Sequence, residues 1–181
     1  MKIEKNIFPN VAIITPDVFY DKTGYFMETF NRVDMSQGGI PVSFCQDNES
    51  YSTYGVIRGL HFQKPPYTQA KLVRVVKGEI LDVIVDMNPH SITFGRYFSV
   101  VLSAENKKQL FVPEGYAHGF ATLSSEAIVV YKCSEYYNKA SESGVIYNDA
   151  KLNIDWIIPE ADRIVSEKDL NLPTFNSHFN K

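Results

Sequence analysis

Short apolar, β-branched runs separated by turn residues recur along most of the chain. Its ten glycines and nine prolines are spread between these runs rather than clustered. This spacing is typical of many antiparallel strands that pack as a sandwich or a barrel. The pattern predicts strands at residues 11–15, 25–30, 42–51, 71–76, 80–86, 97–102, 109–112, 119–123 and 127–133.

Helix is scarce in the same pattern. One short helix is expected at residues 31–38, where Gly38 and Gly39 would end it, and a further helical turn is expected after Ser103 or at Ser166. Across 181 residues there is no linker, internal repeat or low-complexity run, and 44% of residues are hydrophobic. We therefore expect a single domain over residues 1–181 with one sizeable core.

The net charge and the N-terminal sequence limit the classes of function that the chain can have. A net charge of −3 argues against nucleic-acid binding, which needs a basic face to displace counterions from phosphates. The longest apolar run near the N-terminus is four residues, at 11–14, which is too short for a signal peptide or a membrane span. The chain is expected to act in the cytoplasm without a membrane partner. Cys45 and Cys133 are too few for a disulfide framework and are expected to be small buried thiols.

Residues 55–76, GVIRGLHFQKPPYTQAKLVRVV, hold the most unusual local chemistry. Two arginines, two lysines and a histidine lie in an apolar setting, and buried charge of this kind normally meets a ligand. Strand alternation places Gly59, His61 and Gln63 on one face. It would put Arg58 opposite His61, but a bulge at Gly59 would bring both to one side. The stretch is interpreted as the wall of an anion-binding catalytic cavity.

The motif RGLHFQ, followed by PYTQAKLVRVVKGEILDVIVDM, resembles the nucleotide-sugar 3,5-epimerases. Further matches follow in register: SITFG at 91–95, LSAENKKQLFVPEGYAHGF at 102–120, YK at 131–132, IDW at 154–156 and SEKD at 166–169. The resemblance covers nearly the whole chain. It implies an all-β double-sheet jelly roll of the cupin type, with a few short helices. It also implies a homodimer in which an N-terminal strand of one subunit joins the sheet of the other.

The candidate proton-transfer groups depend partly on chemistry and partly on this resemblance. An imidazole can take and return a proton near neutral pH, but His61 alone could equally be a structural histidine. The resemblance implies that His61 is the general base, that Asp169 orients it, and that Tyr131 is the proton donor. Lys71, with Arg58, is expected to face the negative charge that develops on a ketone oxygen.

The resemblance also implies a set of substrate contacts and two departures from the family pattern. Without it, each of these residues would be taken as an ordinary surface or loop polar group. Thr23 stands where the family usually has an arginine in a D-x-R-G turn, and Ser143 stands where an arginine commonly follows the glutamate. A missing guanidinium removes a bidentate phosphate partner. The expected substrate-binding residues are Glu28, Gln46, Asp47, Asn48, Arg58, Lys71, His118, Glu142 and Lys168.

A cupin fold invites a metal hypothesis. Metal-binding cupins place His-x-His and a later glutamate on one strand pair, with a further histidine downstream. Here the first motif reads His61-Phe62-Gln63, and His118 fits the downstream position. Two histidines without the carboxylate form a poor site, so no metal is expected.

These observations predict an epimerase that inverts C3 and C5 of a nucleotide-linked 4-keto-6-deoxyhexose through enolate intermediates. The substrate implied by the resemblance is dTDP-4-dehydro-6-deoxy-D-glucose, in a step of rhamnose and surface-polysaccharide synthesis. The substrate ketone acidifies both neighbouring C–H bonds, so no cofactor is expected, and the chain has no glycine-rich cofactor loop. Two alternatives stay open: a 3-epimerase or ketoisomerase acting on another nucleotide sugar, and a non-catalytic cupin that binds a sugar.

Overall fold

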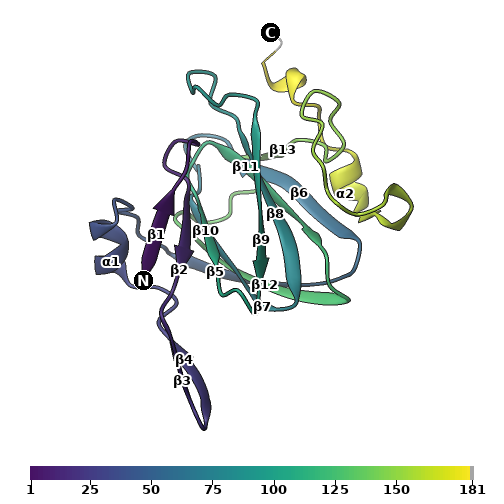
Figure 1. Ribbon diagram of the computed structural model, residues 1–181. Helices are drawn as coiled ribbons and strands as arrows, with labels where there is room; N and C mark the ends of the chain where they lie inside the picture. Colours follow the sequence, from purple (N-terminus) through teal and green to yellow (C-terminus); the bar gives the residue numbers. More distant parts are fainter. Residues whose placement is uncertain (180–181) are drawn as a thin grey trace.

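The computed structural model describes residues 1–179, which form a sandwich of two six-stranded sheets with a separate hairpin (Figure 1). One sheet has the order β1-β2-β10-β7-β12-β5. The other has the order β13-β6-β11-β8-β9, and β14 adds to β6 in parallel. The strands are β1 (Lys2–Lys5), β2 (Ala12–Thr15), β3 (Val18–Asp21), β4 (Gly24–Met27), β5 (Gln46–Thr53), β6 (Val56–Gln63), β7 (Lys71–Lys77), β8 (Glu79–Asp86), β9 (Tyr97–Ser103), β10 (Gln109–Val112), β11 (Tyr116–Thr122), β12 (Glu126–Cys133), β13 (Glu142–Gly144) and β14 (Ile164–Val165).

Alternation of side chains along these strands builds a core between the sheets and one layer outside each sheet. Val73, Ile84 and Val129 pack in the interior. Trp156 and Phe175, from the C-terminal segment, cover the outer face of the β6 sheet. Met35 covers the outer face of the β2 sheet. Figure 1 shows this layering, with α1 beside β1 and the C-terminal segment over the opposite side of the sandwich.

The helices are short and carry clear end signals. In α1 (Arg32–Gln37) the side chain of Asn31 accepts hydrogen bonds from the backbone N–H groups of Val33 and Asp34, and Gly38 is the C-terminal cap. In α2 (Glu167–Leu170) Ser166 is the N-cap. Two 3₁₀ turns, η1 (Glu160–Asp162) and η2 (Asn176–His178), complete the helical elements of the described residues. The helix predicted at 31–38 and the turn predicted at Ser166 are both confirmed.

The sandwich confirms the all-β jelly-roll prediction. The short strands β1, β3, β13 and β14 were not predicted, and three strand boundaries differ from the prediction by three residues or more. The strand predicted at 42–51 begins only at Gln46, because its partner strand β12 ends at Cys133, directly opposite. The strand predicted at 25–30 ends at Met27, because the chain turns there into the Asn31 cap. The strand predicted at 119–123 begins at Tyr116, since β8 continues to pair with it as far as Asp86.

Two further features bear on the sequence predictions. Cys133 is buried as expected, but Cys45 is exposed, because it lies just before β5 begins; both thiols are free. No helix within residues 1–179 has the length and apolar character needed to cross a bilayer.

Candidate active site

Two adjoining cavities, of about 190 and 260 Å³, lie inside the sandwich and share His61, Lys71 and Tyr131 as lining residues. His61 comes from β6 of one sheet, whereas Lys71 and Tyr131 come from β7 and β12 of the other. The shared space is therefore bounded by an imidazole on one side and by an ammonium and a phenol on the other. The smaller cavity is also lined by Gln46, Asn48, Gln63, Cys133, Tyr137 and Glu142, and the larger by Ser50, Arg58, His118, Ser166, Lys168 and Asp169.

A bulge in β6 brings Arg58 and His61 to the same side. His61 pairs with His118 on β11, but Arg58 pairs with Phe120, so that two residues of β6, Gly59 and Leu60, stand opposite the single residue Gly119 of β11. Gly59 at this point has φ +110°, and a Cβ there would lie 2.7 Å from the Cα of Gly119. Only glycine fits this conformation and close approach. The bulge predicted at Gly59 is confirmed.

Asp169 holds the ring of His61 from behind. The Nε2 atom of His61 lies 2.6 Å from Oδ1 of Asp169, and the backbone N–H of Gly59 donates to Oδ2 at 3.1 Å. The side chain of Asp169 is 5% exposed, and its own N–H donates to the Ser166 hydroxyl. Burial acts to raise the pKa of Asp169, but the hydrogen bond and charge of His61 outweigh it, so that this pKa lies below its ordinary value.

An ionised Asp169 fixes the tautomer of His61. Because the carboxylate can only accept, Nε2 of His61 must carry the hydrogen, which leaves the lone pair of the neutral ring on Nδ1. The carboxylate also stabilises the imidazolium that forms when the ring takes a proton. His61 is thus arranged to act as a base.

On the facing sheet, Lys71 and Tyr131 lie close together, with the Lys71 ammonium 5.9 Å from the centre of the Tyr131 ring. Burial lowers the pKa of Lys71, and the nearby carboxylate of Asp82 acts in the opposite direction. Burial raises the pKa of the Tyr131 phenol, while the charge of Arg58 opposes this shift. The raised pKa keeps Tyr131 protonated at neutral pH, as a proton donor must be.

A second histidine–carboxylate pair lies beside the first. The Nε2 atom of His118 is 2.7 Å from Oδ1 of Asp82, and both side chains are buried. His118 is the cross-strand partner of His61, so the two imidazoles line the same wall of the larger cavity.

Glu142 and Lys168 form an ion pair at the edge of the cavities, and the Tyr137 hydroxyl donates to Glu142 at 3.0 Å. Burial acts to raise the pKa of Glu142, but the hydrogen bonds from Lys168 and Tyr137 lower it below its ordinary value. Glu142 is therefore a charged acceptor near neutral pH.

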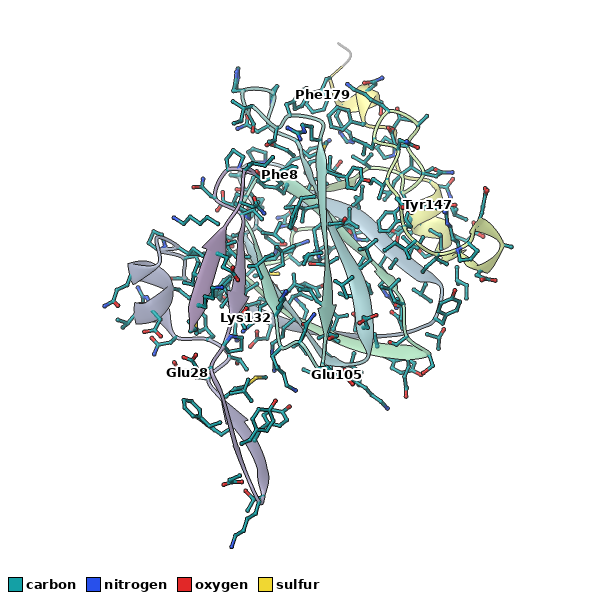
Figure 2. All side chains as sticks on the ribbon, in the orientation of Figure 1. Phe8, Glu28, Glu105, Lys132, Tyr147 and Phe179 are labelled. Atoms are coloured by element: carbon teal, nitrogen blue, oxygen red, sulfur yellow. The ribbon has the colours of Figure 1, made fainter. Side chains whose placement is uncertain are left out.

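The structure brings all but two of the predicted site residues to these cavities. Asp47 points to the opposite face of its sheet, where it pairs with Lys132 at 3.0 Å. Glu28 lies where the β3–β4 hairpin joins the body of the protein, away from the interior (Figure 2), and accepts a hydrogen bond from Asn31. Thr23 lies in the exposed turn of that hairpin, bonded to Asp21. Ser143 is in β13, opposite Phe62.

Several polar groups that the sequence prediction did not include also contribute. Asp82 could have been found, because a carboxylate in the middle of the apolar run ILDVIVDM needs a buried partner. The N–H of Gly59 and the hydroxyl of Ser166 carry no comparable signal, since both act through the local backbone. Among residues 1–179 no cluster of three or more histidine, cysteine or acidic side chains is arranged to hold a metal ion.

The fold and the cavity define the class first: a cupin-type jelly-roll protein whose interior is equipped for proton transfer. The family model for dTDP-4-dehydrorhamnose 3,5-epimerase matches residues 5–177. The chain is 49% identical over 172 residues to the dTDP-4-dehydrorhamnose 3,5-epimerase of Shigella flexneri, covering 94% of each chain. The chain belongs to the dTDP-4-dehydrorhamnose 3,5-epimerase family, whose members are isomerases.

Two solved structures are similar to the whole chain. The dTDP-4-dehydrorhamnose 3,5-epimerase from Elizabethkingia anophelis NUHP1 superposes with a TM-score of 0.93 at 50% identity, covering 98% of this chain and 97% of that one. A dTDP-6-deoxy-D-glucose-3,5-epimerase from Legionella pneumophila, in complex with dTDP-4-keto-L-rhamnose, superposes with a TM-score of 0.92 at 42% identity, covering 97% and 93%. The family assignment therefore agrees with the sequence resemblance.

Proposed function

We propose that this chain inverts C3 and C5 of dTDP-4-dehydro-6-deoxy-D-glucose to give dTDP-4-dehydro-L-rhamnose, acting as a single-domain enzyme. The observation that carries the proposal is the placement of His61 and Tyr131 on opposite sheets around one cavity. Inversion at carbon requires a proton to leave from one face and to return to the other. A base and an acid on opposing walls supply these two steps.

In the proposed reaction His61 takes the proton from the carbon next to the ketone. The electron pair of the C–H bond moves into the C3–C4 or C5–C4 bond, and the negative charge appears on the C4 oxygen as an enolate. Lys71 and Arg58, which both line the larger cavity, supply positive N–H donors to that oxygen, and fixed donors of this kind lower such barriers by several kcal/mol. The Tyr131 hydroxyl then donates a proton to the carbon from the other side, and proton exchange with water restores both groups.

Two observations weigh against the alternatives. A non-catalytic sugar-binding cupin would not need a carboxylate held 2.6 Å from the base and removed from solvent. A 3-epimerase or ketoisomerase would use the same base, but double inversion needs a donor that reaches two carbons, and Tyr131 lines both cavities. Double epimerisation is therefore the proposed reaction.

A homodimer is part of the proposal. The β3–β4 hairpin projects from the sandwich (Figure 1), and its aromatic residues are largely exposed: Phe19, Tyr20, Tyr25 and Phe26. Exposed apolar groups gathered on one element are typical of a binding surface. Thr23 lies in the turn of this hairpin and Glu28 at its base, and neither lines the cavities of its own chain, so that a second copy of the chain is the surface they would meet. The joining of an N-terminal strand to the partner's sheet, and the cytoplasmic location, stay predictions from the sequence.

Product analysis tests the proposed function. Purified protein is incubated with dTDP-4-dehydro-6-deoxy-D-glucose, and the 4-keto products are reduced with borohydride and identified by their sugar configuration. We expect L-rhamnose and its C4 epimer. Recovery of sugars inverted only at C3 would assign a 3-epimerase, and recovery of unchanged configuration would leave a binding protein.

A further inference from the structure

The inward-facing side chains of β5 form a polar row within an otherwise apolar interior. Strand alternation puts Gln46, Asn48, Ser50 and Ser52 on the face that lines the cavities. The neighbouring strands present Val73 and Val129 at comparable depth. Four polar residues in succession at interior positions require partners, because burying an unpaired polar group is costly.

Three members of this row have protein partners. Gln46 donates to Asn48 at 2.9 Å and accepts from the backbone of Tyr137. Asn48 donates to the sulfur of Cys133 at 3.5 Å. Ser52 accepts from Nε of Arg58 at 3.0 Å, which helps to aim that guanidinium.

Ser50 is the exception. Its Oγ is shielded from solvent and has no hydrogen-bond partner in the described residues, although the residue lines the same cavity as His61, Lys71 and Tyr131. A hydroxyl that is left unpaired lowers the stability of the folded protein. Rotation about χ1 moves a serine hydroxyl among three staggered positions, so the Ser50 hydroxyl can turn toward the cavity when a ligand offers a partner.

We propose that Ser50 is a further substrate-contacting residue, whose hydroxyl hydrogen-bonds a hydroxyl group of the hexose ring. This inference rests on the proposed function, since it requires a sugar between the two sheets. A hydroxyl both donates and accepts, which matches another hydroxyl. The enolate oxygen has stronger donors in Lys71 and Arg58, and it needs no neutral one. The contact therefore exists in both the ground state and the transition state.

The test compares Ser50→Ala with Thr122→Val. Thr122 is the matched control, because its Oγ1 is also buried without a partner among residues 1–179, and the residue lines neither cavity. Binding is measured calorimetrically with dTDP-glucose, which carries the sugar hydroxyls and lacks the reactive ketone, and with dTDP alone. Thermal unfolding is followed for each unliganded variant.

Ser50→Ala should bind dTDP-glucose about fivefold more weakly than wild type, the effect of one neutral hydrogen bond, and should bind dTDP equally well. Its KM for the 4-keto substrate should rise by a similar factor with kcat within about twofold, because uniform binding affects KM alone. The Tm of the unliganded variant should be unchanged or higher. Thr122→Val should likewise have an unchanged or higher Tm, and its affinities for dTDP-glucose and for dTDP should equal those of wild type.

Unchanged dTDP-glucose affinity in Ser50→Ala would overturn the inference and leave water as the partner of the hydroxyl. Equal weakening of dTDP would also overturn it, by moving the contact to the nucleotide. A lower Tm with weaker binding of both ligands would show a structural role instead. If wild type bound neither ligand, the proposed function itself would fail, a result distinct from failure of the Ser50 contact alone.

Discussion

Replacing Asp169 with asparagine isolates the contribution of the carboxylate behind His61. The substitution keeps the size of the side chain, but it removes the charge and one of two acceptor oxygens. Asp169 uses separate oxygens for the His61 ring at 2.6 Å and for the Gly59 N–H at 3.1 Å. An amide has a single oxygen, so it can satisfy only one of these donors.

The size of the expected loss in rate follows from the charge of Asp169 and from the tautomer of His61 that it fixes. Two unit charges about 4 Å apart interact by about 4 kcal/mol at an effective dielectric constant near 20, and solvent at the 33% exposed ring of His61 reduces this value. A loss of about 3 to 4 kcal/mol in stabilising the imidazolium corresponds to a roughly 10²- to 10³-fold lower rate, at about 1.4 kcal/mol per factor of ten. If the asparagine NH₂ group faced Nε2 of His61, it would favour the tautomer that carries its hydrogen on Nδ1. The nitrogen that should accept the substrate proton would then be blocked.

The assay is steady-state turnover of dTDP-4-dehydro-6-deoxy-D-glucose, together with calorimetric binding of dTDP-glucose. We expect kcat to fall by the factor given above while binding of dTDP-glucose stays within about threefold, because Asp169 acts through His61. Glu167→Gln is the control, since this exposed carboxylate lies in the same short helix and should leave kcat unchanged. Retention of a third or more of the activity by Asp169→Asn would refute the assignment of Asp169 as the group that orients the base.

Three further predictions address the base, the acid range of stability and the hairpin. His61→Ala should reduce turnover by at least ~10³-fold with an unchanged fold by circular dichroism, and dialysis against a strong chelator should leave the wild-type rate unchanged; near-normal turnover of the variant, or a chelator loss reversed by added metal, would contradict this. The pKa of Asp169 is lowered on folding, so the unfolded chain binds more protons in acid. The stability that Asp169 contributes is therefore complete above its ordinary pKa of 3.8 and is lost as the pH falls toward the folded value. Denaturant unfolding of Asp169→Asn should consequently lose less free energy than wild type between about pH 5 and pH 2, and parallel curves would count against the lowered pKa. Thr23→Arg should lower the KM for the substrate by a factor that corresponds to about 1 to 3 kcal/mol of binding free energy, with little change in kcat, because the arginine adds a phosphate contact. An unchanged KM would mean that the pyrophosphate does not approach the hairpin.

Local signals in the sequence predicted most of the architecture. The strand at 109–112 and the helix after Asn31 follow from a short apolar run and from a cap with a Gly-Gly end, and both lie where expected. The bulge at Gly59 was also predictable, because two polar residues three apart cannot share a face of a regular strand. Such features depend on neighbours in the chain and so are readable from it.

Features that depend on distant partners were not readable in the same way. Asp169 lies 108 residues after His61, and no periodicity connects them, so only the family resemblance pointed to the pair. The unpaired hydroxyl of Ser50 becomes visible only once its neighbours in space are known. The start of β5 at Gln46 was set by the end of β12, a tertiary limit that overrides the local apolar pattern.

The most direct measurement follows the transfer of protons to both carbons. Wild-type protein is incubated with dTDP-4-dehydro-6-deoxy-D-glucose in deuterated water, and the positions of deuterium in the product are determined by NMR. Deuterium is expected at both C3 and C5, because each inverted carbon receives a solvent-derived proton. Tyr131→Phe should still exchange deuterium through His61 but should form little inverted product, since removal and return then occur on one face. Label at C3 alone in the wild-type product would contradict double epimerisation, and full inversion by Tyr131→Phe would show that another group or water is the donor.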